Sequence, residues 1–253
     1  MAWYGPDGRR LYYEDSGGAG DVVVLLPGWA GNIAEFAGLR RALAGGLRVI
    51  AAALPGSGRS EPQPRYYAAT YYRDDAEYLL GFLGALGVPA AHLVGFSDGG
   101  EEALLMAALR PRCALSVVTW GAAGQIVAAE EELDALADVV DHPSEELLPL
   151  AAYLAQAYGA DTARIMTGTW AAAMRGIAGA GGDISRSRAA DIACPALLIT
   201  GTYDAHCPPD LVREMADAIP RGRFVEAAGA GHAVHQWDSQ WLADAVLNWL
   251  SEH

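Results

Sequence analysis

One serine in this sequence stands in a pattern that serine nucleophiles use. Ser97 is the centre of Gly95-Phe96-Ser97-Asp98-Gly99, which fits G-x-S-x-G, and this pentapeptide follows an apolar run and opens a helical pattern. Such a serine occupies a sharp, strained turn that projects its hydroxyl, and the flanking glycines remove side chains that would collide there. The pattern predicts that Ser97 is a nucleophile rather than an ordinary turn residue.

A serine hydroxyl is a weak nucleophile near neutral pH and needs a general base within hydrogen-bonding reach. His232 ends the segment GAGH, which follows the last run with strand character. We predict that His232 is this base. His235, three residues further along, is the alternative, whereas His92 lies in a predicted strand and is expected to be structural.

The base in turn needs a carboxylate that holds its tautomer and stabilises the imidazolium. Asp204 ends the segment GTYD, directly after an apolar run that ends at Thr200. We predict that Asp204 is this carboxylate. The alternative is an aspartate that only caps a turn or helix, because Pro208 and Pro209 follow closely.

An oxyanion hole requires backbone N–H groups that point at the developing charge. We expect one from Asp98, the residue after the nucleophile, and one from the loop PGWAG that follows the run VVVLL. We choose the Trp29 N–H because Gly28 lets the chain turn back toward Ser97. The alternative for this loop is a plain glycine turn.

Strand and helix patterns alternate along most of the chain. Apolar, β-branched runs predict strands, and longer patterns between them predict crossover helices. This alternation of strands and helices predicts an α/β fold with a mostly parallel sheet and helices on both faces. The predicted strands cover residues 10–14, 22–26, 47–54, 92–96, 115–120, 196–200 and 223–227, and the helices cover 33–43, 69–86, 98–109, 209–219 and 236–250.

One stretch, residues 122–188, contains no convincing strand. Residues 130–140, 144–158 and 161–177 have helical patterns, and the run AGAGG at 178–182 marks a flexible return. We therefore predict a core of residues 1–121 and 189–253, and an inserted helical cap of residues 122–188, called the cap segment below. It should cover the carboxyl edge of the sheet, where open α/β sheets bind ligands.

Composition excludes several classes of function. The chain has 253 residues and a net charge of −14, so a nucleic acid would be repelled. All 17 basic residues are arginine, which excludes Schiff-base chemistry on a lysine. The expected partner is a small-molecule substrate.

Location and cofactor use are also predicted from sequence. No apolar run reaches the roughly 18 residues that would suggest a membrane span, and no basic segment followed by an apolar one opens the chain. We therefore expect a cytoplasmic protein that does not bind membranes. Cys113, Cys194 and Cys207 are widely spaced and form no C-x-x-C pair, so we expect no disulfide framework, metal site or cofactor.

Taken together, these motifs resemble the α/β-hydrolase superfamily, in which the triad also follows the chain order Ser, Asp, His. More narrowly, the chain is similar to the valacyclovir hydrolase (biphenyl hydrolase-like) group. It departs from the wider superfamily at Pro27, where many members carry histidine, and from the narrower group in having its arginine later in the loop, at Arg59. The matching pieces are LLPG at 25–28, LPGSGRS at 54–60, SDGG at 97–100, WGA at 120–122, CPAL at 194–197 and GH at 231–232.

The resemblance implies a serine hydrolase of small carboxylic esters. In the narrower group the aspartate that matches Asp98 binds the ammonium of α-amino acid esters, so Asp98 is expected to do the same. The competing interpretation is that Asp98, in the first turn of a helix, only favours the helix dipole. Further substrate-binding candidates are the aromatic residues Trp29, Phe96, Trp120 and Trp170.

Two other functions remain open. The same triad serves C–C bond hydrolysis, lactonisation or cyclisation in a biosynthetic pathway. A ligand-binding receptor built on this fold is the third interpretation.

Overall fold

The computed structural model describes residues 2–253, and within them the chain forms one sheet of eight strands. The strand order is β1-β2-β4-β3-β5-β6-β7-β8; the pairs β1–β2 and β2–β4 are antiparallel and the other neighbours are parallel. The predicted α/β fold with a mostly parallel sheet is confirmed. The strands are β1 (Ala2–Tyr4), β2 (Leu11–Asp15), β3 (Val22–Leu26), β4 (Arg48–Ala52), β5 (Ala91–Phe96), β6 (Ala114–Trp120), β7 (Ala196–Gly201) and β8 (Gly222–Ala227).

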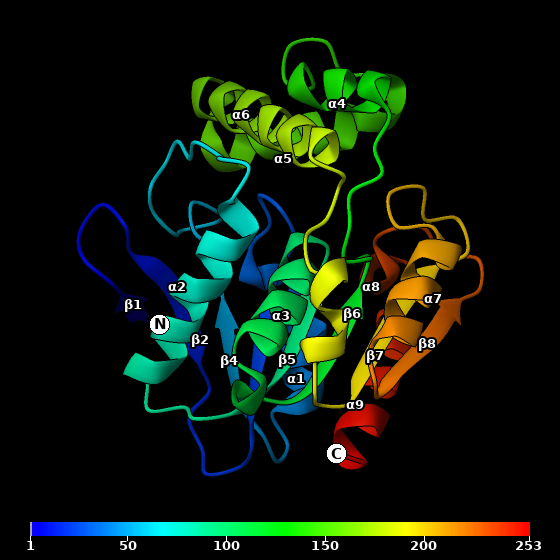
Figure 1. Cartoon of the computed structure of the whole chain (residues 1–253). Helices are drawn as coiled ribbons and strands as arrows, with labels where there is room; N and C mark the ends of the chain where they lie inside the picture. Colours follow the sequence, from blue (N-terminus) through cyan, green and yellow to red (C-terminus); the bar gives the residue numbers. More distant parts are fainter. Residues whose placement is uncertain (1) are drawn as a thin grey trace.

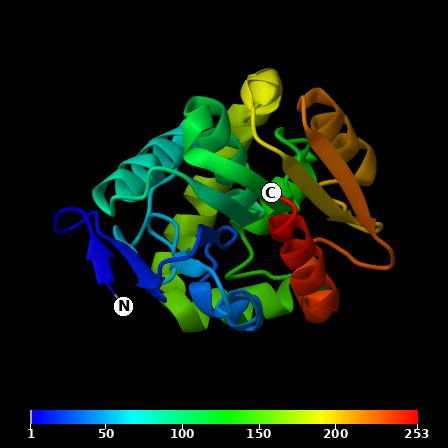
Figure 2. The same cartoon turned by 90° about the horizontal axis from the view of Figure 1, so that it is seen from below.

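Helices cover both faces of this sheet (Figure 2). In the central strand β3, Val24 and Leu26 pack on one face while Val23 and Leu25 pack on the other, as expected of a strand buried on both sides. The first face is covered by α2 (Tyr71–Ala85), α3 (Asp98–Leu109) and α7 (Pro209–Ala218). The second is covered by α1 (Ala37–Leu43) and α9 (Ser239–Ser251).

Three helices between β6 and β7 form a separate group above the sheet (Figure 1). They are α4 (Glu130–Ala137), α5 (Leu148–Tyr158) and α6 (Ala160–Gly179). The chain leaves and re-enters the core at one place, where Gln125 and Asp183 form an isolated β-bridge. The division into core and cap segment stays a prediction; its second boundary, at 188/189, falls inside the 3-10 helix η4 (Arg186–Asp191), which packs against α3.

Several elements differ from the expectation. The helices predicted over 33–43 and 144–158 each begin with a short 3-10 helix, η1 (Ile33–Phe36) and η3 (Glu145–Leu147). The edge strand β1 was not predicted, because three residues are too few to give a periodic pattern. The single helix predicted over 236–250 is two helices, α8 (Val234–Trp237) and α9. Asp238 separates them in an extended conformation, and its carboxylate accepts the N–H groups of Gln240 and Trp241 at the start of α9. Among residues 2–253, no helix combines the length and the apolar character needed to cross a membrane.

Candidate active site

Ser97 lies in a strained turn between β5 and α3. Its backbone has φ 51° and ψ −122°, a region that residues other than glycine seldom occupy. A Cβ on Gly95 would lie 2.2 Å from the Gly99 carbonyl oxygen, and a Cβ on Gly99 would lie 2.4 Å from that of Leu26. Both glycines of the pentapeptide are therefore required by close backbone approaches.

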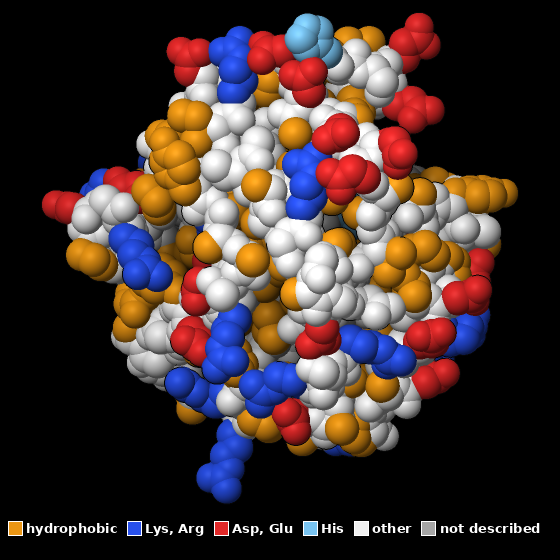
Figure 3. Space-filling view, turned by 45° about the horizontal axis from the view of Figure 1, so that its top comes forward, with side chains coloured by type: hydrophobic (Ala, Val, Ile, Leu, Met, Phe, Trp, Pro, Cys, Tyr) orange, Lys and Arg blue, Asp and Glu red, His pale blue; other side chains and the backbone are white. Residues whose placement is uncertain are grey.

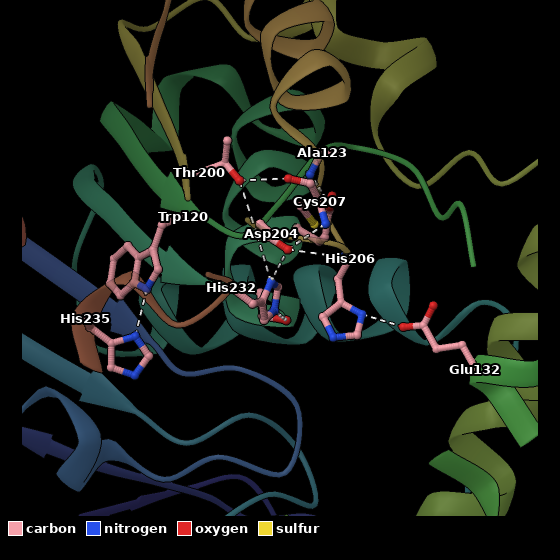
Figure 4. Close-up of polar contacts among 11 residues, drawn as sticks. Trp120, Ala123, Glu132, Thr200, Asp204, His206, Cys207, His232 and His235 are labelled. Carbon is pink, nitrogen blue, oxygen red and sulfur yellow. Dashed lines mark hydrogen bonds and ion pairs between the residues drawn. The ribbon is translucent and has the colours of Figure 1, made fainter. Parts of the chain in front are cut away.

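The structure brings Ser97, His232 and Asp204 together from three loops at the carboxyl edge of the sheet. His232 Nε2 lies 3.0 Å from Ser97 Oγ, and His232 Nδ1 lies 3.1 and 3.0 Å from the two carboxylate oxygens of Asp204. The side chain of His232 points at Asp204 in Figure 4. Gly121 makes room for the imidazole, since a Cβ there would lie 2.7 Å from His232 Cε1.

Asp204 is buried and held from several sides. Its Oδ1 accepts the backbone N–H groups of His206 and Cys207 at 3.0 and 2.9 Å, and Thr200 Oγ1 lies 3.2 Å from Oδ2. Burial alone would raise the pKa of Asp204, but the hydrogen bond to His232 and that histidine's charge outweigh it and lower the pKa. The carboxylate therefore stays ionised, as needed to accept the Nδ1–H of an imidazole.

The alternative base, His235, lies in the core. Its Nδ1 accepts the indole N–H of Trp120 at 3.0 Å, and burial lowers its pKa to about 4 (Figure 4). The expectation that Trp120 binds substrate is wrong: its side chain is fully buried and stacks on Phe96, on the side of the sheet that α1 and α9 cover. His92 is also structural, with its Nδ1 2.8 Å from Ser116 Oγ.

A cavity of about 250 Å³ lies beside Ser97, between the sheet edge and the cap helices. Trp29, Phe96, Asp98 and Trp170, four of the candidate substrate-binding residues, line it. The Trp29 and Trp170 rings contact each other with centroids 4.7 Å apart. Most of the remaining lining is apolar and includes Ile126, Val127, Ala128, Leu133, Leu136, Leu150, Met174 and Ile184.

The carboxyl group of Asp98 is buried at the floor of this cavity. The hydroxyls of Tyr71 and Tyr72 each donate a 2.8 Å hydrogen bond to one of its oxygens. Burial raises the pKa of Asp98 to about 6, although the two tyrosine hydrogen bonds act in the opposite direction. Sequence reasoning missed both tyrosines. The only feature in the sequence that could have indicated them is that two tyrosines stand next to each other at the start of α2.

A second buried carboxyl group on α3 also borders the cavity. Glu101 accepts the backbone N–H groups of Ala123 and Gly124 at 2.8 and 2.9 Å. Burial raises its pKa to about 7, against the effect of those two hydrogen bonds. Glu101 therefore ties α3 to the place where the chain leaves the core for the cap helices.

A contact between a histidine and a carboxyl group joins core and cap beside the triad. His206 Nδ1, on the loop after β7, lies 2.5 Å from Glu132 Oε1 on α4 (Figure 4). The His206 ring also contacts the His232 ring edge-on, with centroids 5.0 Å apart. Both partners line the cavity, so the pair forms part of its wall.

The triad region also holds the one group of His, Cys, Asp and Glu side chains among residues 2–253 whose donor atoms could share a metal ion. It consists of Asp204, Cys207 and His232, with donor atoms within 4.8 Å of one another. A thiol binds metals as the thiolate, yet burial raises the pKa of Cys207 well above its usual value. The arrangement suits an ionised Asp204 that orients the His232 imidazole better than it suits metal binding.

The loop that carries Trp29 runs directly against the serine turn. A Cβ on Gly28 would lie 3.0 Å from the Phe96 ring and 3.3 Å from Ser97 Cβ, so this glycine permits the approach. The Asp98 N–H lies at the first turn of α3, whose N-terminus favours negative charge. The two residues expected to form an oxyanion hole thus flank Ser97.

Comparison with known proteins identifies the family. Residues 23–245 match the model of the Alpha/beta hydrolase family. The chain belongs to the alpha/beta hydrolase family. This alpha/beta hydrolase is 29% identical to the human Serine hydrolase BPHL over 206 residues, which are 80% of this chain and 69% of that protein. The predicted resemblance to that group is confirmed, and the chain is a hydrolase enzyme.

Two further known proteins are matched over a larger share of their own length. The alpha/beta hydrolase is 30% identical over 233 residues to the Pimeloyl-[acyl-carrier protein] methyl ester esterase of Chromobacterium violaceum, covering 85% of this chain and 89% of that one. The solved structure of the enol-lactonase from Burkholderia xenovorans LB400 superposes with a TM-score of 0.78 at 25% identity, covering 99% and 100% of the two chains.

Proposed function

We propose that this hydrolase cleaves small carboxylic esters through an acyl-enzyme on Ser97, and that esters of α-amino acids are its preferred class. The observation that carries the proposal is the hydrogen-bonded series of Ser97 Oγ, His232 and Asp204, with 3.0 Å between Ser97 Oγ and His232 Nε2. This is the geometry in which a histidine removes the proton of a serine during attack.

In the first half of the reaction, Ser97 Oγ attacks the ester carbonyl carbon while its proton moves to His232 Nε2. The carbonyl oxygen becomes an oxyanion, which the backbone N–H groups of Trp29 and Asp98 stabilise. When this intermediate collapses, the alcohol oxygen takes the proton from His232 and leaves. Asp204 stays ionised throughout and holds the imidazolium by its Nδ1–H.

The second half repeats these steps with water. A water molecule gives one proton to His232 Nε2 and attacks the acyl carbonyl, and the same N–H groups stabilise the second oxyanion. Collapse releases the carboxylic acid and returns the proton to Ser97 Oγ. The sum is one ester and one water converted into one acid and one alcohol, with the enzyme unchanged.

The charges around the cavity favour a neutral or cationic substrate. Three carboxyl groups, from Asp98, Glu101 and Glu132, line it. Among the described residues of the lining none is arginine, and the chain has no lysine. A substrate ammonium would meet Asp98 next to Ser97, and the carboxylate retains lone pairs beyond the two that the tyrosines occupy.

The same charges count against the alternatives that need an anionic substrate. A diketone or lactone that carries a carboxylate would enter a cavity with three carboxyl groups and no arginine or lysine in its described lining. Like charges at short range in a partly dry site repel each other strongly. We therefore favour ester hydrolysis over C–C hydrolysis or lactone chemistry on charged substrates.

The first experiment tests the nucleophile. A fluorophosphonate probe, which reacts with activated serines, should label the wild type and should not label Ser97→Ala, and ester hydrolysis should be lost in the variant with the fold intact. Near wild-type turnover by Ser97→Ala would refute the assignment. A protein that neither reacts with the probe nor hydrolyses any ester would favour the receptor interpretation.

The second experiment tests the substrate class with a matched pair of esters, one with and one without the α-amino group. For Asp98→Asn, kcat/KM for the amino ester should fall about ten- to a hundred-fold, the value of one charge-assisted hydrogen bond. The ester without the amino group is the internal control and should be unaffected or hydrolysed faster. Equal losses on both esters would show that Asp98 serves only the turn and the helix dipole.

A further inference from the structure

The loop that carries Trp29 contains a residue in an unfavourable backbone conformation. Ala30 has φ 52°, in the left-handed region that glycine occupies without penalty and alanine avoids. The loop is closed by a hydrogen bond from the Gly31 N–H to the Gly28 carbonyl at 3.0 Å. A residue in this region persists only where the surrounding structure holds it, so neighbouring groups must hold Ala30 in place.

The groups that hold Ala30 come from the cap. The carbonyl oxygen of Ala30 accepts two hydrogen bonds, from the hydroxyl of Tyr153 at 2.8 Å and from that of Tyr158 at 2.6 Å. Both tyrosines belong to α5, more than a hundred residues along the chain from the loop. The strained loop of the core is thus held by a cap helix.

Each tyrosine hydroxyl is also fixed by a donor from the core. The Gly58 N–H donates to Tyr158 Oη at 2.8 Å, and the Asn32 side-chain amide lies 3.3 Å from Tyr153 Oη. Because each hydroxyl accepts from one group, its single proton is directed at Ala30. Burial raises the pKa of both tyrosines, so these protons are retained.

The opposite side of the loop faces the nucleophile. Gly28 packs against Phe96 and Ser97 so closely that a Cβ would contact both. The indole of Trp29 contacts that of Trp170 on α6. The loop that carries Trp29 is therefore held between Ser97, which approaches Gly28, and the two tyrosines of α5, which bond to Ala30.

We infer that Tyr153 and Tyr158 are positioning residues for the oxyanion hole, acting through the Ala30 carbonyl. This inference rests on the proposed function only in taking the Trp29 N–H as an oxyanion donor. Without the two hydroxyls, Ala30 can relax toward ordinary backbone angles and the Trp29 N–H turns away from the oxyanion. The two tyrosines then contribute to transition-state stabilisation although neither lines the cavity.

The test uses Tyr153→Phe, Tyr158→Phe and the double variant in the full chain. In the double variant kcat for an ester should fall about ten- to a hundred-fold with little change in KM, because an oxyanion contact acts in the transition state and not in the ground state. Binding of an alkyl boronic acid, which forms a tetrahedral anion on Ser97, should weaken by a similar factor. Binding of the carboxamide isostere of the ester, measured by calorimetry on Ser97→Ala, should not change.

A matched control is available in the same chain. The hydroxyl of Tyr78 also donates to a backbone carbonyl, that of Arg9 at 2.5 Å, in a part of the fold that does not line the cavity. Tyr78→Phe should lose a similar hydrogen bond while keeping kcat and boronic acid affinity. Thermal unfolding reports whether each variant is folded, and complete fluorophosphonate labelling counts its active sites.

Two results would overturn the inference: a folded double variant that binds the boronic acid as tightly as the wild type, or one in which boronic acid and carboxamide lose affinity equally. Boronic acid binding does not depend on ester turnover. A wrong ester class would therefore appear as lack of hydrolysis by the wild type, with the tyrosine test still decisive.

Discussion

At the scale of single residues, the site depends on how burial and partners set the charge of each group. Asp204 receives two backbone N–H groups and the imidazole of His232, and its pKa falls despite burial. Asp98 receives two phenol hydroxyls, and burial raises its pKa to about 6. The two aspartates are therefore suited to different tasks, one permanently ionised and one that titrates near neutral pH.

The triad predicts a strongly non-additive set of variants. Ser97→Ala and His232→Ala should lose similar amounts of kcat, and the double variant should lose little more, because the two groups act in one proton transfer. Asp204→Asn should reduce kcat by up to about ten-thousand-fold, the figure for the corresponding change in the protease triad. Steady-state kinetics on one neutral ester measures all four variants.

His235→Ala serves as the comparison for the triad variants. It should retain kcat within about tenfold, since the buried imidazole of His235 bonds to Trp120 and not to Ser97. Losses that multiply in the Ser97 and His232 double variant would contradict a coupled pair.

Asp98 predicts a pH dependence of selectivity. The ratio of kcat/KM for an α-amino ester to that for its des-amino analogue should rise as pH increases through about 6, because the carboxyl group then loses its proton and gains charge. The ratio should fall again above about 7 to 8, where the substrate ammonium is deprotonated. A group whose protonation changes the rate on both esters alike cancels in the ratio.

The variant Asp98→Asn isolates this effect. Its selectivity ratio should be flat through the lower pH range, so the increase near pH 6 should be absent. A rising limb that survives in Asp98→Asn would assign the titration to another group, and Glu101, with a pKa of about 7, would be the first to examine.

At the scale of elements, the turn between β5 and α3 predicts a contrast between two glycines. Gly99→Ala places a Cβ 2.4 Å from two backbone oxygens and should lower the free energy of unfolding by about 1–3 kcal/mol and abolish turnover. In Gly84→Ala, on α2, the added Cβ meets nothing within 4 Å. This variant should raise the free energy of unfolding by about 0.5–1 kcal/mol and keep full activity. Urea denaturation of both variants provides the comparison, and a stable, active Gly99→Ala would show that the turn can relax.

Elements with strong patterns were predictable from the sequence. Seven of the eight strands correspond to predicted runs, and α3 begins and ends at the predicted residues 98 and 109. The exceptions have local causes. Strand β1 is too short to show a period, and the break between α8 and α9 arises because Asp238 caps the second helix with its own side chain.

Side chains that act across the fold were harder to predict. The elbow motif and chain order located Ser97, Asp204 and His232, because those signals are local. The direction of the Trp120 side chain depends on which face of β6 it occupies, and one residue's shift in a strand reverses the face. The contacts of Tyr71, Tyr72 and Tyr153 join segments far apart in the chain, which no local pattern reports.

At the scale of the whole molecule, the charge distribution favours cations at the mouth of the site. Acidic side chains gather around the cap end of the molecule, with basic ones mostly toward the opposite edge (Figure 3). A field of this sign raises the local concentration of a cationic substrate and weakens as salt screens it. In the cap segment the acidic residues are Glu130, Glu131, Glu132, Asp134, Asp138, Asp141, Glu145, Glu146, Asp161 and Asp183, and the arginines are Arg164, Arg175, Arg186 and Arg188.

Buried acids give the stability of the whole chain an unusual pH dependence. The pKa of Glu101 is about 7 in the folded state against 4.5 for an ordinary glutamate, so the folded state binds more protons between these values. Its contribution to the free energy of unfolding therefore decreases as pH rises across that window, by about 1.4 kcal/mol per unit of difference in pKa, and levels off above it.

Glu101→Gln should remove this contribution while its carbonyl oxygen still accepts the N–H groups of Ala123 and Gly124. Denaturation in urea at about pH 5 and about pH 8 should show a smaller decrease in stability for the variant than for the wild type. Because Asp98 and other acids titrate in both proteins, only the difference between the two is assigned to Glu101. Equal decreases would mean that Glu101 is ionised throughout.

The single crossing point between core and cap has an evolutionary consequence. The carbonyl of Gly124 accepts the N–H groups of Ile184, Ser185 and Arg186, so the outgoing and returning chain are fastened together within a few residues. A segment whose ends meet can be lengthened, shortened or exchanged without moving the strands on either side. Selection can thus change the roof over Ser97, and with it the accepted substrate, while the turn that holds the nucleophile is inherited unaltered.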